Sequence, residues 1–473
     1  MTENLKLNYH EVDFIVPVHR FNFRFSYVTK QGLSFIREFV LRLVQLAPMK
    51  PSQVAIYIGL NKAEVSEAIS DLMDKGDLRF NELGQVELTP QSESYFDGLG
   101  KPPRTASIQE TGTALSYELC GFNCIGNKRS SGGWKRGIEL KVDNKKLSQT
   151  EELAKSIFQK EFYHYLDKDF LKGVKSEDSV RPSIYTMDSV NKLTKDALRL
   201  PCEFYIDPDG RAIEREDFET LDDSTEVHEL ITRTLGQNRK SSNITEIAHA
   251  MNDIGDHWTK EVFNNISVDL VSFAHRAAES LSDDKKPNIF VGPIYAKQNW
   301  EHISNLMESA LKKYSDSKDK SVRTLKWIAP SDSYWGKSSS IVSSFSEIEE
   351  LQLTKGKNPQ RVFQPSIYLP LFDASDRKGS WYWKNHLGDS SLNIFGLIEG
   401  FMGGSIEVLY LENEFVVVCY HISRPDSLPV TMPVGFISTD VRIIRQVSEM
   451  ANDYIGNTTS YNKPNDLGLM KNL

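Results

Sequence analysis

The sequence has few cysteines, no long apolar run and no excess of basic residues. Only 4 of its 473 residues are cysteine, too few for a disulfide framework, which fits a reducing compartment. No stretch approaches the roughly 20 consecutive apolar residues that a membrane-spanning helix needs. The N-terminus lacks the basic segment followed by an apolar one that marks a secretory signal. We therefore expect a cytoplasmic protein that makes no contact with a membrane.

Acidic residues outnumber basic ones, 65 against 56, and the formal net charge is −9. This balance excludes a surface that binds nucleic acid everywhere, so any contact with DNA must come from a local basic patch. With 39% hydrophobic and 26% charged residues, the composition is that of an ordinary globular protein. Its length is sufficient for two to four domains.

Motifs for nucleotide and metal binding are incomplete. A phosphate-binding loop needs a glycine five residues before Gly336, and that position is Ser331. Cys120 and Cys124 are close enough to share a zinc ion, but no second Cys or His pair follows at ligand spacing. We therefore expect neither a cofactor nor a metal ion.

Residues 31–98 carry the most regular pattern in the chain. Apolar residues recur at helical spacing over residues 35–44, which predicts a first helix. A short second helix is expected to begin at Ser52 as its N-cap. A third helix is expected to begin after Asn61, also an N-cap residue, and to end at Gly76.

The third helix is followed by the pattern of a small hairpin. Leu78 and Phe80 alternate with polar residues, a turn follows, and Val86 and Leu88 alternate back. With these three helices and a two-stranded wing, residues 1–100 resemble a winged helix-turn-helix domain. The resemblance implies DNA binding, with the third helix in the major groove.

The expected exposed face of the third helix is mainly acidic. Glu64, Glu67, Asp71 and Asp74 lie opposite its apolar positions, and such a face is repelled by phosphate. Two uses of the module therefore stay open, reading DNA or binding a protein. The groups that would favour DNA lie near the start of the helix and in the wing: Asn61, Lys62, Ser66 and Arg79.

A strand is predicted directly before the module. Phe21, Phe23, Phe25 and Tyr27 alternate with polar residues, so one face of the strand is aromatic. An aromatic face can stack on nucleic-acid bases. Burial against a neighbouring helix is the alternative, and it is the one we expect.

A basic segment follows a proline-containing linker at residues 101–104. Between Lys128 and Lys146, seven basic residues stand against two acidic ones, a local net charge of +5. Two glycines within the segment would let the backbone approach a phosphate closely. The alternative is a solvated hairpin tip. The candidate nucleic-acid contacts are Lys128, Arg129, Trp134, Lys135 and Arg136.

The rest of the chain changes from helical to alternating patterns. Helical spacing dominates the middle, while strands alternate with helices from residue 286 and a late hairpin is expected over residues 407–420. We therefore predict an α+β multidomain protein. Its expected parts are residues 1–100, a winged helix with its preceding strand; residues 101–150, a linker and basic loop; residues 151–285, a mainly helical region; and residues 286–473, an α/β domain that senses a ligand or docks a partner.

The last part has a second resemblance. A strand and turn at residues 435–440 lead into an amphipathic helix, and a helix at residues 300–314 precedes another strand. This order is similar to phospholipase D-like domains of some winged-helix regulators. Active members carry His-x-Lys pairs, and none of the ten histidines here has lysine two positions later. The resemblance therefore implies a catalytically silent domain.

One short segment has the composition of a pocket lining. Trp381, Trp383, His386 and Asp389 lie close together in the sequence and combine aromatic surfaces with polar tips. His386 and Asp389 form the one pair to test as a general base. The alternative is an amphipathic helix packed on the sheet.

Three functions stay open at this point. The first is a DNA-binding winged-helix protein, either a regulator or the DNA-sensing or scaffolding subunit of a bacterial multi-protein system such as antiphage defence. It would bind duplex DNA and a protein partner, and it could form homo-oligomers. The second is a nuclease or phosphodiesterase in the C-terminal half. The third is a winged helix used only for protein assembly, which predicts no salt-sensitive affinity for DNA.

Overall fold

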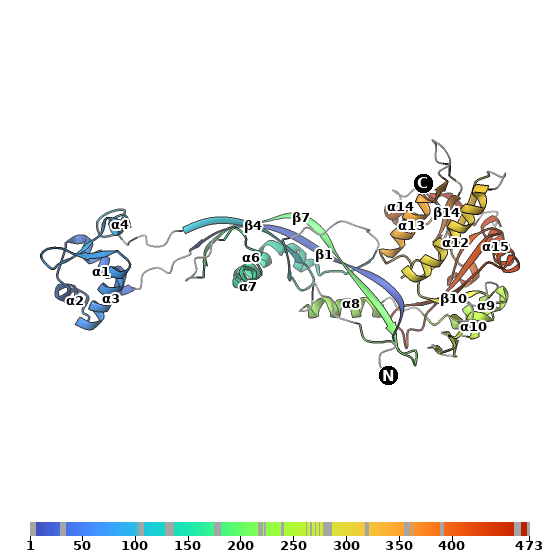
Figure 1. Cartoon of the computed structure of the whole chain (residues 1–473), viewed down its shortest axis with the longest axis horizontal. Helices are drawn as coiled ribbons and strands as arrows, with labels where there is room; N and C mark the ends of the chain where they lie inside the picture. The colour runs from blue at the N-terminus through green and yellow to red at the C-terminus, as the bar shows by residue number, and fades with distance from the viewer. Residues whose placement is uncertain are drawn as a thin grey trace.

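The chain is elongated, with a helical module at one end, a long β-ribbon in the middle and a larger α/β domain at the other end (Figure 1). Among the described residues, no helix combines the length and apolar character needed to cross a membrane. This computed structural model describes residues 6–28, 35–101, 103, 108–127, 137–174, 181–215, 221, 224–237, 241–261, 263–264, 267–269, 271–273, 275–277, 286–316, 321–353, 360–361, 363–387, 392–457 and 465–470.

The N-terminal module, residues 35–101, packs its helices and a hairpin around one apolar core. Asn61 is the N-cap of the third helix, as predicted, because its side chain accepts a hydrogen bond from the Glu64 N–H at 2.9 Å. The second helix begins at Pro51, so Ser52 lies inside it and is not the cap. The elements are α1 (Phe35–Leu46), α2 (Pro51–Ile58), α3 (Lys62–Asp74), the antiparallel strands β2 (Leu78–Phe80) and β3 (Val86–Leu88), and α4 (Pro90–Glu93).

Two very long strands form the ribbon. β1 (Leu7–Val28) and β7 (Ser183–Ile206) pair antiparallel along their lengths, which corresponds to about 70 Å at roughly 3.3 Å per residue. β4 (Ile108–Glu118) pairs with the half of β1 that lies toward the module, and Val28 is opposite Ile108. The module is therefore an insertion between the adjacent ends of β1 and β4. Two short strands complete this sheet, β5 (Cys124–Gly126) on β4 and β6 (Ile138–Glu139) on β1.

The strand predicted before the module belongs to this ribbon and not to the module. Its aromatic residues, Phe21 to Tyr27, are at most 1% exposed. They are covered by the helices α6 (Thr150–Lys160) and α7 (Phe162–Asp167), and the rings of Phe23 and Phe158 stack with centroids 4.4 Å apart. Burial of the aromatic face is confirmed, and these rings are not available to stack on bases.

The expectation of a mainly helical stretch over residues 151–285 missed β7. Between Ser183 and Ala197 only Met187 of this strand is buried, so the alternation of apolar residues that marks a strand is absent there. The other elements of this region are α5 (Asn144–Ser148), α8 (Thr225–Gln237), α9 (Ile244–Ile254), α10 (Trp258–Glu261) and the two-stranded β8 (Phe263–Asn264) and β9 (Ser267–Val268).

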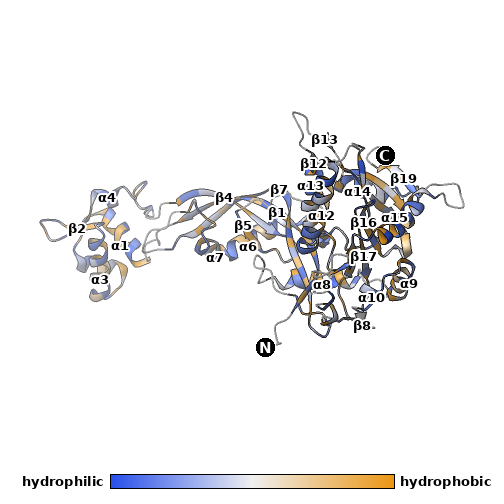
Figure 2. Ribbon diagram, turned by 45° about the vertical axis from the view of Figure 1, so that its right-hand side comes forward, coloured by the Kyte–Doolittle hydropathy of each residue, from blue (hydrophilic) through white to orange (hydrophobic). Residues whose placement is uncertain are grey.

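The C-terminal domain is built on a mixed eight-stranded sheet in the order β10-β18-β17-β16-β11-β14-β15-β19. The late hairpin is confirmed by the antiparallel pairing of β16 with β17. Both are hydrophobic throughout most of their length (Figure 2). The strands are β10 (Asn288–Val291), β11 (Arg323–Ile328), β14 (Phe363–Leu371), β15 (Asn393–Ile398), β16 (Ile406–Leu411), β17 (Phe415–Ile422), β18 (Met432–Ser438) and β19 (Asp466–Leu469), with the separate pair β12 (Gln352–Leu353) and β13 (Gln360–Arg361).

Helices cover both faces of this sheet. Alternate residues of β16 and β17 point to opposite faces, so Leu409 and Val417 join one core and Val408 and Val418 join the other. The first core is completed by α12 (Lys297–Asp316), α13 (Ser340–Glu350) and α14 (Arg377–Leu387). The second is completed by α9, the 3-10 helix η1 (Phe401–Gly404) and α15 (Val441–Gly456).

Candidate functional site

The predicted DNA contacts of the N-terminal module lie on its surface. Asn61, Lys62 and Ser66 are exposed at the start of α3. Arg79 on β2 is also exposed, but its Nε donates to Oε1 of Glu87 on β3 at 2.7 Å. The positive charge of Arg79 is therefore paired inside the hairpin.

The module as a whole carries excess negative charge. Residues 35–101 contain ten acidic and seven basic side chains. Asp71 on α3 is neutralised by Arg37 at 2.7 Å and Lys75 at 3.0 Å, whereas Glu67 is exposed on the same helix. A net charge of −3 repels a phosphate backbone, so DNA binding by the module needs cations from elsewhere in the chain.

The basic loop that could supply those cations lies outside the described residues, but both of its ends are placed. The carbonyl of Asn127 accepts a hydrogen bond from Arg20 Nη1 at 2.7 Å. Gly137 packs so closely on Ile15 that a Cβ atom there would come within 2.6 Å of Ile15 Cγ1. Both anchors are on β1, so the loop leaves the middle of the ribbon. The predicted contacts Lys128, Arg129, Trp134, Lys135 and Arg136 stay predictions.

A cleft of about 480 Å³ opens beside the first of these anchors. Phe170 lines it, and the carbonyl of Phe170 accepts a hydrogen bond from the Asn127 side chain at 2.8 Å. Lys160, His164 and Lys168 also line the cleft, as does Glu161, whose Oε1 lies 3.4 Å from Lys160 Nζ. This side of the ribbon therefore offers basic groups next to the start of the basic loop.

The predicted pocket residues are spread over two sides of α14. Trp381 is 68% exposed, whereas Trp383 is buried and its ring packs against Trp335, with centroids 6.0 Å apart. His386 Nδ1 lies 2.6 Å from the Tyr382 carbonyl of the preceding helical turn. Asp389 lies outside the described residues. The two tryptophans therefore do not line one common surface.

The loop that resembled a phosphate-binding loop is closed by protein groups. The N–H of Gly336 donates to the Tyr295 hydroxyl at 2.8 Å, and the N–H of Ser339 donates to Asp13 Oδ2 at 2.8 Å. Lys337 donates to Tyr382 and, at 3.4 Å, to the Gly137 carbonyl. The N–H groups and the lysine that would hold a phosphate in such a loop are hydrogen-bonded within the chain.

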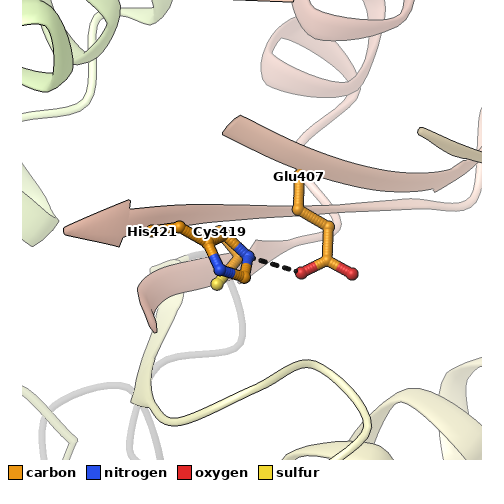
Figure 3. A group of neighbouring side chains, drawn as sticks. All are labelled: Glu407, Cys419 and His421. Carbon is orange, nitrogen blue, oxygen red and sulfur yellow. Dashed lines mark hydrogen bonds and ion pairs between the residues drawn. The ribbon is translucent and has the colours of Figure 1, made fainter. Parts of the chain in front are cut away.

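Behind this loop lies a buried polar cluster that the sequence did not predict. Glu407 on β16 is directly opposite Cys419 on β17, and His421 follows two residues later on the same face of the sheet. All three side chains are at most 1% exposed. His421 Nε2 and Glu407 Oε2 are 2.9 Å apart (Figure 3).

Every other polar atom of the cluster also has a partner. His421 Nδ1 is 2.9 Å from Asp332 Oδ2, which also accepts from the Thr431 hydroxyl at 2.7 Å. The second oxygen of Glu407 accepts two indole N–H groups, from Trp327 and Trp335, each at 2.7 Å. Buried carboxylates are stable only with such compensation.

The protonation states follow from these contacts. Burial alone would lower the pKa of His421, but Cys419 and the hydrogen bonds to Asp332 and Glu407 outweigh burial and raise that pKa well above its usual value. Burial opposes ionisation of Asp332, yet the hydrogen bond and charge of His421 lower its pKa to about 2. Burial raises the pKa of the Cys419 thiol to about 11. The His421 ring therefore lies between the carboxyl groups of Asp332 and Glu407, beside the Cys419 side chain.

The loop that follows Ala329 joins the cluster to the base of the ribbon, which is the end of β1 that lies at the C-terminal domain. Ser338 donates to Glu11 Oε1 at 2.6 Å, and Asp13 accepts from both Ser339 and Arg199, the latter at 2.6 Å. Asp13 is only 2% exposed. The end of β1 is therefore fixed to the C-terminal domain by buried, charge-assisted hydrogen bonds.

A pH-dependent stability is expected from His10, which is fully buried at this junction. Burial lowers its pKa to about 4, against about 6.5 in an unfolded chain. Between these values only the unfolded state binds the proton, so the free energy of unfolding falls as the pH falls from 6.5 to 4. From pH 7 to pH 5 the loss due to His10 should be about 2 kcal/mol.

The pH dependence due to His10 is checked by urea denaturation of the native chain and of a His10→Gln variant, each at pH 7 and at pH 5. The variant should lose about 2 kcal/mol less on acidification. Equal losses in the two proteins would show that His10 is not the titrating group.

Signals for this cluster were present in the sequence. Glu407 and His421 are ionisable residues within otherwise apolar strands, and Cys419 and His421 have the spacing of two residues that puts side chains on one face. Such residues are rare in buried strands unless they are paired. The partner Asp332 lies more than seventy residues away and cannot be inferred from local spacing.

No protein-family model matches this chain, and no curated protein matches it. Among solved structures, it is similar to the archaeal chromatin protein TrmBL2, described as showing a novel mode of DNA binding. The match covers 49% of this chain and 68% of that chain, with 10% sequence identity and a TM-score of 0.18. A TM-score this low supports no argument about function.

Proposed function

We propose that this chain is a DNA-binding protein that uses its N-terminal module as a winged helix-turn-helix domain. The observation that carries the proposal is the order of α1, α2, α3 and the β2–β3 hairpin around a single core, with the start of α3 exposed. In helix-turn-helix proteins the N-terminal residues of the recognition helix contact base edges in the major groove. Asn61, Lys62 and Ser66 occupy that end of α3.

A second contact through the basic loop would supply the charge that the module lacks. The loop anchors at Ile15 and Arg20 lie about 25–45 Å from Val28 along β1, at roughly 3.3 Å per residue. Duplex DNA covers this distance in roughly 8–13 base pairs at about 3.4 Å per pair. The proposal therefore requires a duplex longer than one helical turn for full affinity, because two linked contacts bind more tightly than one.

The test is fluorescence anisotropy with labelled mixed-sequence duplexes of two lengths, one near a single helical turn and one of about three turns. The longer duplex should bind at least about tenfold more tightly. A Lys62→Ala/Ser66→Ala variant should lose about tenfold in affinity for the longer duplex, the loss of about 1.4 kcal/mol. A Lys384→Ala variant on α14 is the matched control and should bind like the native chain. Equal binding by all three proteins would contradict DNA recognition through α3.

The C-terminal domain is proposed to have a phospholipase D-like fold that docks a partner or senses a ligand. Support for the fold comes from β18, which leads through the N-cap Asp440 into α15. A phospholipase D-like domain without His-x-Lys pairs would be catalytically silent. The buried position of His421 does not favour cleavage of a phosphodiester by this domain. Such a protein would serve as a regulator or as the DNA-sensing subunit of a bacterial multi-protein system.

A purely protein-binding role for the module is the second candidate, and a specific observation favours it. Ile56 and Tyr57 on α2 are 79% and 72% exposed, and Leu83 at the hairpin turn is 75% exposed. Adjacent exposed apolar side chains such as Ile56 and Tyr57 are typical of protein interfaces. This candidate predicts no salt-sensitive affinity for DNA, so the same titration at two salt concentrations separates the two functions.

A further inference from the structure

We propose that Glu407, Cys419 and His421 bind one zinc ion in the core of the C-terminal domain. The three ligand atoms, a carboxylate oxygen, the thiol sulfur and an imidazole nitrogen, all lie within 4.8 Å of one another (Figure 3). This site is independent of the proposed DNA contacts, which lie on the module and the ribbon. It also revises the expectation from the sequence that the chain holds no metal ion.

The sheet itself brings the ligands together. Antiparallel pairing of Glu407 with Cys419 puts both side chains on one face, and the period of two along β17 adds His421. All three lie on two adjacent strands in the interior of the sheet. Ligands on rigid neighbouring strands are held in place before a metal ion binds, so little ordering is needed on binding.

A complete outer shell supports the ligands. His421 has its second ring nitrogen on the Asp332 carboxylate at 2.9 Å, and histidines that bind metal ions almost always donate this N–H to such a group. Trp327 and Trp335 both hold Oε1 of Glu407 at 2.7 Å. Oε2 of Glu407 is then the oxygen that faces His421, 2.9 Å from its Nε2. A shell of this kind fixes both the ring orientation and the carboxylate.

The donor set selects the metal. Thiolate, imidazole and carboxylate together are ligands of zinc, whereas calcium and magnesium require six or more oxygen ligands. Iron–sulfur clusters need several thiolates, and Cys419 is the single thiol in this group. Tetrahedral zinc places its ligand atoms about 3.3–3.8 Å apart, given metal–ligand bonds of about 2.0–2.3 Å. The 2.9 Å separation of Nε2 and Oε2 would therefore open by only a few tenths of an ångström.

Three protein ligands leave one position of the tetrahedron for a water molecule. The ion would neutralise the negative charge of Glu407 and the Cys419 thiolate. It would also lie next to the loop that fixes β1 to the C-terminal domain, because Trp335 in that loop holds Glu407. Loss of zinc is therefore expected to loosen the C-terminal core at the base of the ribbon.

The test begins with the metal content of the purified full chain, measured by inductively coupled plasma mass spectrometry. About one zinc per chain is expected in the native protein. Cys419→Ala and His421→Ala variants should retain less than about a tenth of it, since each removes one of only three ligands. Cys202→Ala is the matched control, since Cys202 is also a buried thiol in a strand, and it should keep its zinc.

A second measurement covers the case in which a core variant fails to fold. Native protein stripped with a chelator is titrated with Co²⁺, and a thiolate-to-cobalt charge-transfer band should appear with one-to-one stoichiometry and disappear on addition of Zn²⁺. Native protein that carries no zinc and gives no such band would overturn the proposal and leave the hydrogen-bonded cluster alone. Folded Cys419→Ala protein with a full complement of zinc would overturn it as well.

Discussion

Replacement of Glu407 by alanine is expected to lower the free energy of unfolding by about 3–5 kcal/mol. The carboxylate accepts the indole N–H groups of Trp327 and Trp335 and contacts His421, and none of these groups is exposed to water. Removing it leaves the two indole N–H groups and Nε2 of His421 buried without a partner, although His421 Nδ1 keeps its contact with Asp332. Unpaired buried polar groups cost more than the bonds themselves contribute. The measurement is urea denaturation followed by tryptophan fluorescence.

Glu412→Ala is the control for this experiment. Glu412 lies at the turn of the same β16–β17 hairpin, but its side chain is 52% exposed, and exposed pairs contribute less than about 1 kcal/mol. A Glu407→Ala variant that is no less stable than Glu412→Ala would show that the buried cluster does not hold the C-terminal core together.

A Phe23→Ala substitution in β1 is expected to lower the free energy of unfolding by about 3–5 kcal/mol. The ring is fully buried and stacks on Phe158 at 4.4 Å, so the substitution leaves a cavity between the ribbon and α6. Thermal unfolding followed by circular dichroism measures the loss. Tyr185→Ala, which removes a 64% exposed aromatic ring from β7, should change stability by no more than about 0.5 kcal/mol.

The same pair of variants separates the two interpretations of the aromatic face. As part of the core, Phe23 should affect stability and leave DNA affinity unchanged at temperatures where the variant is folded. A Phe23→Ala protein of native stability with weakened DNA binding would mean that these rings contact bases after all.

Local patterns predicted the parts of the fold that local interactions determine. The cap at Asn61, the helices of the N-terminal module and the hairpin of β16 and β17 each depend on residues a few positions apart. Asp440 caps α15 in the same local way, because its side chain accepts a hydrogen bond from the Arg442 N–H at 2.8 Å. Capping, periodicity and turn chemistry are all readable within a short window.

The strand neighbours that the sequence did not predict depend on pairing between segments that are far apart in the chain. Phe23 pairs with Val190 of β7, although the whole N-terminal module lies between these two residues in the sequence. No local pattern indicates which strands will be neighbours. β14 contains Pro365 and Pro370, yet it lies between β11 and β15 in the interior of the sheet. Each proline removes only one donor from the ladder, and the neighbouring residues maintain the pairing.

The candidate sites also fall into two groups, those that local patterns predict and those that only long-range pairing brings together. Asn61, Lys62 and Ser66 were placed correctly at the exposed start of a helix, because amphipathic spacing defines both faces of α3. The group around His421 draws its members from two strands and a distant loop, so only the folded sheet brings them together. Ionisable residues within apolar strands were the one local indication.

The most direct test of DNA binding is the salt dependence of affinity for the longer duplex, measured for the native chain and for a variant with alanine at Lys128, Arg129, Lys135 and Arg136. Each phosphate contact contributes about −0.9 to the slope of log K against log salt. The proposed function predicts a steep slope in the native chain and a slope shallower by up to about 3.6 in the variant. Salt-independent binding, or identical slopes in the two proteins, would contradict it.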